Sequence, residues 1–240
     1  MGYPLQETRV LVLPDRRLTY TLVRRRRRSI GLKVDGDGLT VAAPPREPYR
    51  HLERVLLERR DWIIEKLAQM EARRLPPRQW RSGERLLLLG EALELYLFRT
   101  HTRGEPIRTA SRLLVGVRDP ADREQVAAQV AAWYRRLAER HFAQRLAVLA
   151  PRLPVEPPPF RLSEARTSWG ACTPEGRLRL SWRLIKAPPA QIDYVIAHEL
   201  AHLRHMNHSR AFWQTVERIF PDWRAQRAAL ERDGHLYHTF

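Results

Sequence analysis

The sequence predicts an α+β protein in which a β-rich N-terminal subdomain, residues 1–117, precedes a helix–sheet–helix part, residues 118–240. Two observations lead to this prediction. In the first part, short alternating segments are separated by glycine and proline turns, which is typical of hairpins. In the second part, long segments with helical spacing surround a few short alternating ones. Apolar residues make up 43% of the chain, enough for a substantial core.

The N-terminal subdomain is expected to contain strands and one helix. Its clearest turn is Asp35-Gly36-Asp37-Gly38, which favours a tight hairpin. After Pro44-Pro45, apolar residues recur at helical spacing, and one helix is expected over about residues 49–74. The segments with strand composition are residues 9–13, 18–23, 30–34, 39–42, 85–89, 92–97 and 113–117.

The C-terminal part begins with a long amphipathic pattern over residues 122–149, which predicts a helix. Two short strands are expected after it, at residues 160–163 and 177–182. Pro188-Pro189 then favours the start of another helix, because proline is tolerated in the first helical turn.

The composition limits the choice of partner and compartment. The net charge of +16 fits a nucleotide or nucleic-acid partner. Only three of the 43 basic residues are lysines, however, so the charge also fits a compositional bias toward arginine on ordinary solvated faces. No apolar run reaches the ~20 residues that span a bilayer, and the first residues lack a secretory-signal pattern. With the single cysteine Cys172, we expect a cytoplasmic protein without an internal disulfide and without membrane contact.

The densest charge is the arginine run Arg24–Arg28. If this run continues a strand, its side chains alternate, and those on one side suit contacts to phosphate. The alternative is a solvated edge strand whose charges prevent pairing with another chain. The tryptophans and tyrosines are scattered and show no pattern for stacking on single-stranded nucleic acid.

The most informative motif is H-E-x-x-H, formed by His198, Glu199 and His202. Residues four apart lie on one face of a helix, so both imidazoles can bind one metal ion. Apolar residues in front of the motif, Tyr194–Ala197, and within it, Leu200-Ala201, predict a helix with a buried side. Two histidines at this spacing beside a glutamate are typical of a catalytic zinc site.

A third ligand must approach from another direction, because zinc prefers a tetrahedron. His205 continues the histidine stripe, but on a straight helix it lies ~10 Å along the axis from the first histidine, too far to share one ion. A turn at Met206-Asn207, with the asparagine in the left-handed conformation that ends many helices, would bring His208 back to the metal. Glu217, on the helix expected after Ser209, is the alternative.

These ligands suggest a mechanism. Three protein ligands leave a fourth position for water, whose pKa zinc lowers toward ~7. Glu199 would accept the proton of that water and pass it to a leaving amine. The sequence does not identify a second group that stabilises the oxyanion. The candidates, each of which could equally be an ordinary core or surface residue, are Tyr194, His205, Arg210 and Tyr237.

Three segments carry a family resemblance: residues 166–172, 184–203 and 198–213, the last of which reads HELAHLRHMNHSRAFW. Together with the arginine-rich strand pair and glycine hairpin near the N-terminus, they resemble the YgjP-like metallopeptidases. Ala171 stands where that family's W-G-S-C segment usually has serine. The SprT-like and WLM proteases are similar over the histidine motif only, and metzincins have glycine where this chain has His205.

The resemblance implies a zincin-like catalytic domain over residues 118–240, with a small antiparallel or mixed sheet beside the H-E-x-x-H helix. It implies one Zn²⁺ ion bound by His198, His202 and His208, with Glu199 as the base and a polypeptide as the substrate.

In zincins generally, an edge strand above the metal receives an extended peptide by strand addition. Here the expected strand is residues 177–182, which contain Arg179. Trp169, Gly170 and His205 are further candidates for substrate contact. The alternatives are core packing for Trp169, a simple turn at Gly170 and a partly exposed helix-end histidine. The thiol of the lone cysteine is expected to be a small buried group, not a nucleophile.

A zinc-dependent peptidase is therefore the leading hypothesis. A second hypothesis is a metal-dependent hydrolase of phosphoanhydrides such as nucleotide triphosphates, because activated water and arginines also suit that reaction. A third is a nucleic-acid-associated protease or binding module whose metal site serves a protein bound there.

Overall fold

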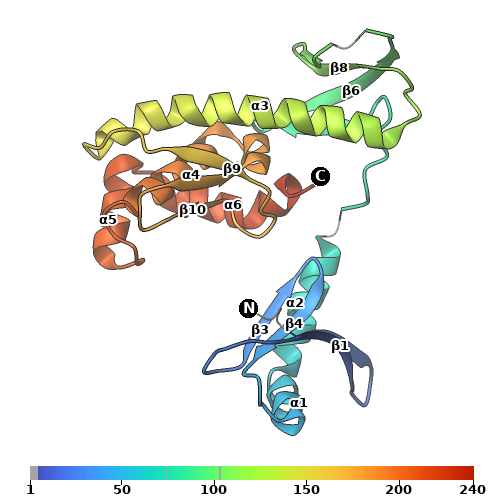
Figure 1. Cartoon of the computed structure of the whole chain (residues 1–240), viewed down its shortest axis with the longest axis vertical. Helices are drawn as coiled ribbons and strands as arrows, with labels where there is room; N and C mark the ends of the chain where they lie inside the picture. The colour runs from blue at the N-terminus through green and yellow to red at the C-terminus, as the bar shows by residue number, and fades with distance from the viewer. Residues whose placement is uncertain (1–4, 74, 103) are drawn as a thin grey trace. The chain divides into compact units, whose positions relative to one another are not determined.

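The computed structural model describes residues 5–73, 75–102 and 104–240, and the chain forms two compact units, Met1–Pro76 and Pro77–Phe240 (Figure 1). This division differs from the boundary expected after residue 117. The strands between residues 85 and 117 bury their leucines and valines in one core with the helices that follow them, so they belong to the second unit.

The first unit contains a four-stranded mixed sheet in the order β1-β2-β4-β3. β2 and β4 are parallel, and the other neighbours are antiparallel. The strands fall where alternation predicted them and have the bounds β1 (Leu5–Val12), β2 (Arg17–Arg24), β3 (Gly31–Asp35) and β4 (Gly38–Ala43).

Two helices follow, α1 (Tyr49–Glu58) and α2 (Arg60–Ala72), where one was expected. The break lies at Arg59, which leaves helical geometry with φ −104° and ψ 12°. In a continuous helix Arg59 would occupy the stripe that buries Leu56 and Ile63 against the sheet. An arginine cannot be buried there without a partner, and it is exposed instead.

The second unit contains two small sheets. One has the order β5-β6-β8-β7, and the other has the order β10-β11-β9, with β11 antiparallel to β10 and parallel to β9. This second sheet is the small mixed sheet that the sequence led us to expect. The strands are β5 (Arg85–Leu88), β6 (Glu91–Arg99), β7 (Ile107–Arg108), β8 (Arg112–Val117), β9 (Phe160–Ser163), β10 (Gly170–Cys172) and β11 (Leu178–Ser181).

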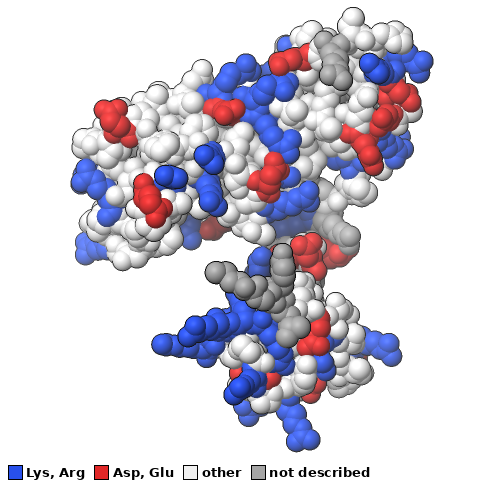
Figure 2. All heavy atoms as spheres, viewed as in Figure 1, with Lys and Arg blue, Asp and Glu red and all other residues white. Residues whose placement is uncertain are grey.

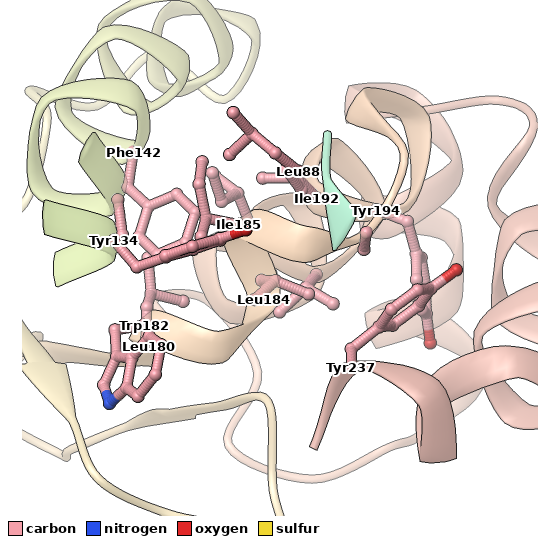
Figure 3. Close-up of a cluster of buried hydrophobic side chains, with 14 of the residues drawn as sticks. Leu88, Tyr134, Phe142, Leu180, Trp182, Leu184, Ile185, Ile192, Tyr194 and Tyr237 are labelled. Atoms are coloured by element: carbon pink, nitrogen blue, oxygen red, sulfur yellow. The ribbon is translucent and has the colours of Figure 1, made fainter. Parts of the chain in front are cut away.

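The helices of the second unit surround a single core. They are α3 (Arg123–Leu149), η1 (Ala150–Arg152), η2 (Trp182–Lys186), α4 (Pro189–Ala201), α5 (Arg210–Ile219) and α6 (Trp223–Tyr237). α3 starts at Asp122, whose side chain accepts a hydrogen bond from the backbone N–H of Gln125 at 3.0 Å. Its Tyr134 and Phe142 pack beside Trp182 and Ile185 (Figure 3), so α3 joins both sheets to the segment that precedes α4.

A buried lysine lies in this core. Lys186 is 1% exposed, and its side-chain nitrogen donates to the backbone carbonyls of Tyr237, at 3.1 Å, and Thr239. The nitrogen also lies 3.6 Å from the centre of the Phe240 ring. Burial, and next the charge of Arg183, lower the pKa of Lys186 to about 6. These contacts fasten residues 237–240 to the core of the unit.

The basic side chains do not form a single cationic strand. Arg24 ends β2, and residues 25–29 lie outside any strand. The Arg24 guanidinium donates to the backbone carbonyl of Glu47 at 2.9 Å. On the face shown in Figure 2, acidic side chains are interspersed with basic ones. Within the described ranges, every helix is too short or too polar to cross a bilayer.

Candidate active site

α4 presents the first part of the site. It carries His198 and Glu199 and ends at Ala201, with His202 as its C-cap. Its apolar residues, from Ile192 to Leu200, are buried in the core of the unit. The histidine spacing therefore lies on a rigid, largely buried helix, as the sequence predicted.

A turn follows α4 and reverses the chain. The backbone N–H groups of Leu203 and Arg204 bond to the carbonyls of Leu200 and Ala201, each at 3.1 Å. None of the described residues 202–208 has a positive φ, so the expected left-handed asparagine was wrong.

Asn207 instead acts through its side chain, whose Oδ1 accepts from the backbone N–H of Ser209 at 3.2 Å. Ser209 in turn caps α5, accepting from the N–H of Phe212 at 3.4 Å. The turn and the cap together place His208 opposite α4.

Three imidazoles converge as a result. The ligand nitrogens of His198, His202 and His208 all lie within 4.8 Å of one another. Nε2 of His198 is 3.1 Å from Nε2 of His208. The ring centres form a nearly equilateral triangle, with sides of 5.0, 5.0 and 4.9 Å. Because Zn–N bonds are ~2 Å long, tetrahedral zinc ligands stand about 3.4 Å apart, and this cluster suits one such ion.

Glu217, the alternative third ligand, and His205, which helix geometry excluded, both lie outside the cluster. Glu217 forms an ion pair with Arg224 at 2.6 Å on the exposed side of α5. His205 is partly exposed, and its backbone carbonyl lies 3.0 Å from Nδ1 of His202. His205 therefore contacts the site through its main chain.

That contact orients a ligand. A carbonyl oxygen only accepts, so Nδ1 of His202 must donate, and the lone pair stays on Nε2 where a metal would bind. Burial, followed by the positive charges that His202 and His208 would carry, lowers the pKa of His198 to about 3. Burial also lowers the pKa of His202. Both rings are therefore neutral at pH 7, the form that binds metals.

A buried aromatic ring packs against all three histidines. The Phe212 ring is fully buried, and its centre lies 4.9, 4.6 and 4.8 Å from those of His198, His202 and His208. Trp213 contacts His198 and His208 from the side, and stacks on Trp223 at 4.4 Å. Sequence reasoning placed Phe212 on this helix but missed its role. The available signal was its position one turn after His208.

Glu199 is almost fully enclosed. It is 5% exposed, and its Oε2 has no hydrogen-bond partner among the described residues. Burial raises the pKa of this carboxyl to about 8. A Cβ at Gly170 would lie only 2.5 Å from Oε1 of Glu199, so a larger residue at this point of β10 would displace the Glu199 carboxyl or the strand. Gly170 therefore lies in a strand packed against Glu199 and not in a turn.

β10 is an edge strand of the three-stranded sheet and packs against α4, and the prediction that residues 177–182 form the edge strand was wrong. β11 is the central strand, and Trp182 belongs to η2. The N–H of Ser181 bonds to the carbonyl of Trp169 at 2.8 Å, which fixes the alternation of hydrogen bonds. In this register the backbone groups of Gly170 and Cys172 point away from β11.

Arg179 and Trp169, the remaining residues expected to contact the substrate, have different surroundings. Arg179 is exposed and pairs in register with Ala171, on the sheet face opposite to Glu199. Trp169 lines a cavity beside the motif, together with Gly170. Trp169 is also packed from behind by the His238 ring, stacked at 3.9 Å, so it is both a wall of the cavity and a packed residue.

The residues considered as stabilisers of the oxyanion also lie in different parts of the unit. Tyr194 lines the same cavity, with its ring 6.1 Å from that of His198. Tyr237 is buried behind Trp169, and Arg210 is exposed at the start of α5. Of these, Tyr194 has the placement that a substrate contact requires.

The comparisons identify the family. A family model described as the YgjP-like metallopeptidase domain matches residues 28–233. The chain belongs to the YgjP-like family. As a YgjP-like protein it is a metallopeptidase, and His198, His202 and His208 form a cluster that could hold its metal.

Among solved structures, the YgjP-like chain is similar to the metallopeptidase zymogen of Pyrococcus abyssi abylysin. The TM-score is 0.34 and the identity 22%, over 42% of this chain and 97% of that one. No curated protein matches the sequence.

Proposed function

We propose that the protein is a zinc-dependent peptidase in which His198, His202 and His208 bind the metal and Glu199 is the general base. The observation that carries this proposal is the convergence of three imidazoles beside a buried carboxylate. Three neutral nitrogen ligands favour zinc over the harder cations, which prefer oxygen.

The chain's own residues have separate roles in the proposed reaction. When bound, zinc would supply Lewis-acid chemistry, activating water and polarising the substrate carbonyl. Glu199 accepts a proton from the attacking water and delivers it to the leaving amine. Its buried carboxyl has a raised pKa, which suits the delivery step, while a nearby cation favours its ionised form for the first step. The His205 carbonyl keeps His202 in the correct tautomer.

The free edge of β10 supports a peptide substrate. Gly170 and Cys172 offer unpaired backbone N–H and C=O groups that an extended peptide can bond as an added strand. β10 packs against α4 (Figure 1), and its Gly170 lies next to Glu199. A peptide bound there would run past the carboxylate.

The other hypotheses have less support. Among the described residues that line the cavity beside Glu199, the one arginine is Arg227. It is paired with Glu231 at 2.9 Å. A triphosphate would need cations that are not already neutralised. Nucleotide or nucleic-acid binding, and a cytoplasmic location, stay predictions from composition.

The test compares the wild type with Glu199→Gln on an unfolded protein and on nucleoside triphosphates. We expect zinc-dependent peptide cleavage that falls by about 10²–10⁴-fold in the variant while its metal content stays the same. Pyrophosphate release lost in the same variant would favour the phosphoanhydride hydrolase instead. Unchanged peptide cleavage by Glu199→Gln would refute the role of this carboxyl.

A further inference from the structure

We infer that the cavity beside Glu199 is a specificity pocket that selects a large apolar or aromatic side chain next to the scissile bond. This inference rests on the proposed peptidase function and names its substrate class.

The size of the cavity suits one side chain. Its volume is about 260 Å³, below the ~300–1,000 Å³ of sites that hold drug-sized ligands. His198 and Glu199 line one part of it, so it opens directly beside the proposed metal and base. A group bound there would be attached to a residue flanking the reacting bond.

The walls are mostly apolar. Val195 of α4 and Leu230 of α6 are buried, with 4% and 6% exposure, and the rings of Trp169 and Tyr194 add further apolar surface to the lining. Burial of an apolar side chain against such walls contributes roughly 1.5–3 kcal/mol. An unpaired charge placed there would lose its hydration without compensation.

Besides Glu199, the lining has two charged residues, and these pair with each other. Nε of Arg227 donates to Oε1 of Glu231 at 2.9 Å, one turn further along α6. Both side chains remain exposed to solvent. The Arg227 guanidinium also lies over the Trp213 ring, 5.1 Å from its centre. Apart from Glu199, which is assigned to catalysis, the described lining therefore has no unpaired charge that would select an acidic or a basic substrate residue.

The aromatic wall is fixed in place. Trp169 is stacked on His238 at 3.9 Å with an angle of 12° between the rings, and Tyr237 contacts its edge. On another side, a Cβ at Gly234 would lie 3.2 Å from the indole, so the helix backbone packs closely against it. The pocket is therefore preformed, which reduces the entropy lost on binding.

The pocket and the free strand edge are contiguous. Gly170 belongs to both, because its backbone lies at the open edge of β10 and it also lines the cavity next to Glu199. A peptide added to this edge alternates its side chains between the two faces of the sheet. One of them would therefore be directed to the α4 side, where the pocket lies.

The first experiment digests an unfolded protein mixture with the wild-type enzyme and maps the cleavage sites by mass spectrometry. Matched peptides that differ only at the selected position then give kcat/KM. We expect phenylalanine or leucine to exceed alanine, aspartate and lysine by at least about tenfold at one flanking position.

The second experiment fills the pocket with Leu230→Trp and uses Ala228→Trp as the control. Ala228 is exposed on the same helix and does not line the cavity. We expect Leu230→Trp to reduce the phenylalanine-to-alanine ratio to below about threefold, and Ala228→Trp to keep the wild-type ratio. If Leu230→Trp does not fold, the wild-type profile alone still decides.

The outcomes separate the two proposals. Metal-dependent cleavage that is lost in Glu199→Gln but shows no preference for large apolar residues, or a preference for charged ones, overturns the pocket and leaves the peptidase proposal intact. Absence of any metal-dependent cleavage by the wild type overturns both. A large apolar preference that survives Leu230→Trp assigns the selectivity to another surface.

Discussion

Gly170→Ala should separate the position of the base from the binding of the metal. The added Cβ would lie 2.5 Å from Oε1, 2.6 Å from Cγ and 2.7 Å from Cδ of Glu199. Non-bonded carbon contacts are favourable at about 3.5–4.0 Å. The carboxyl group must therefore retreat by about 1 Å, or β10 must lift away from α4 by a similar amount.

The size of the expected effect follows from that displacement. Misplacing a catalytic group by about 1 Å can cost on the order of 10²-fold in rate, or ~2.7 kcal/mol. The three atoms nearest to the new methyl group all belong to Glu199, and the histidines lie elsewhere on α4 and beyond it. We therefore expect kcat/KM to fall about 100-fold while the metal content per chain stays at the wild-type level.

The assay is kcat/KM on a peptide substrate, with metal content and thermal unfolding measured on the same samples. Ala171→Val is the matched control, because Ala171 is exposed and faces away from Glu199 on the same strand. It adds more volume, yet we expect less than a threefold effect. The reasoning is refuted if Gly170→Ala stays within threefold of the wild type, or if its activity falls only in proportion to lost metal.

Three further outcomes are expected. His208→Ala should lose bound metal in elemental analysis and Glu217→Ala should keep it; the reverse would refute the ligand assignment. Removing the metal with a chelator should speed hydrogen exchange in residues 202–208 and leave exchange in β1–β4 unchanged. The reason is that a ligand present at a thousandfold its Kd stabilises the unit that binds it by about 4 kcal/mol. Equal changes of exchange in both units would contradict this expectation. The pKa of Lys186 is about 6, below its value of 10.5 in an unfolded chain. Between pH 6 and pH 10.5 the unfolded state therefore binds more protons than the folded state. The free energy of unfolding should rise with pH in this range, by at most about 1.4 kcal/mol per pH unit. Lys186→Met should remove that slope from denaturant unfolding at pH 6.5–9, and an unchanged slope would refute the assignment.

The histidine cluster could be predicted from the sequence because its signal is local. A helical spacing places His198 and His202 together, and the rigid length of a helix excludes His205. The return of His208 required only that the chain turn, and the sequence supports a turn there. The detailed geometry was not determined by the sequence, since Asn207 closes the turn through its side chain and not through a left-handed backbone.

The edge strand and the domain boundary depend on distant contacts. β10 has three residues, too short for any periodicity to be seen, whereas the clear alternation of β11 predicts a half-buried strand without showing whether it lies at the edge or in the centre. Residues 85–117 have ordinary strand patterns, and nothing local shows that their apolar face packs against α3. The support from Phe212 and the stacking of Trp169 on His238 likewise arise only when separate elements meet.

The register of β10 links substrate binding to the chemistry. Because side chains alternate along a strand, a slip of one residue would place Ala171, with its side chain, where Gly170 now lies against Glu199. The same slip would turn the backbone groups of Gly170 inward and offer those of Ala171 at the free edge. The turn at Thr173–Arg177, closed by a 3.0 Å hydrogen bond, prevents this by fixing the hairpin. The position of the Glu199 carboxyl therefore depends on this hairpin as well as on α4, although the hairpin carries none of the three clustered histidines.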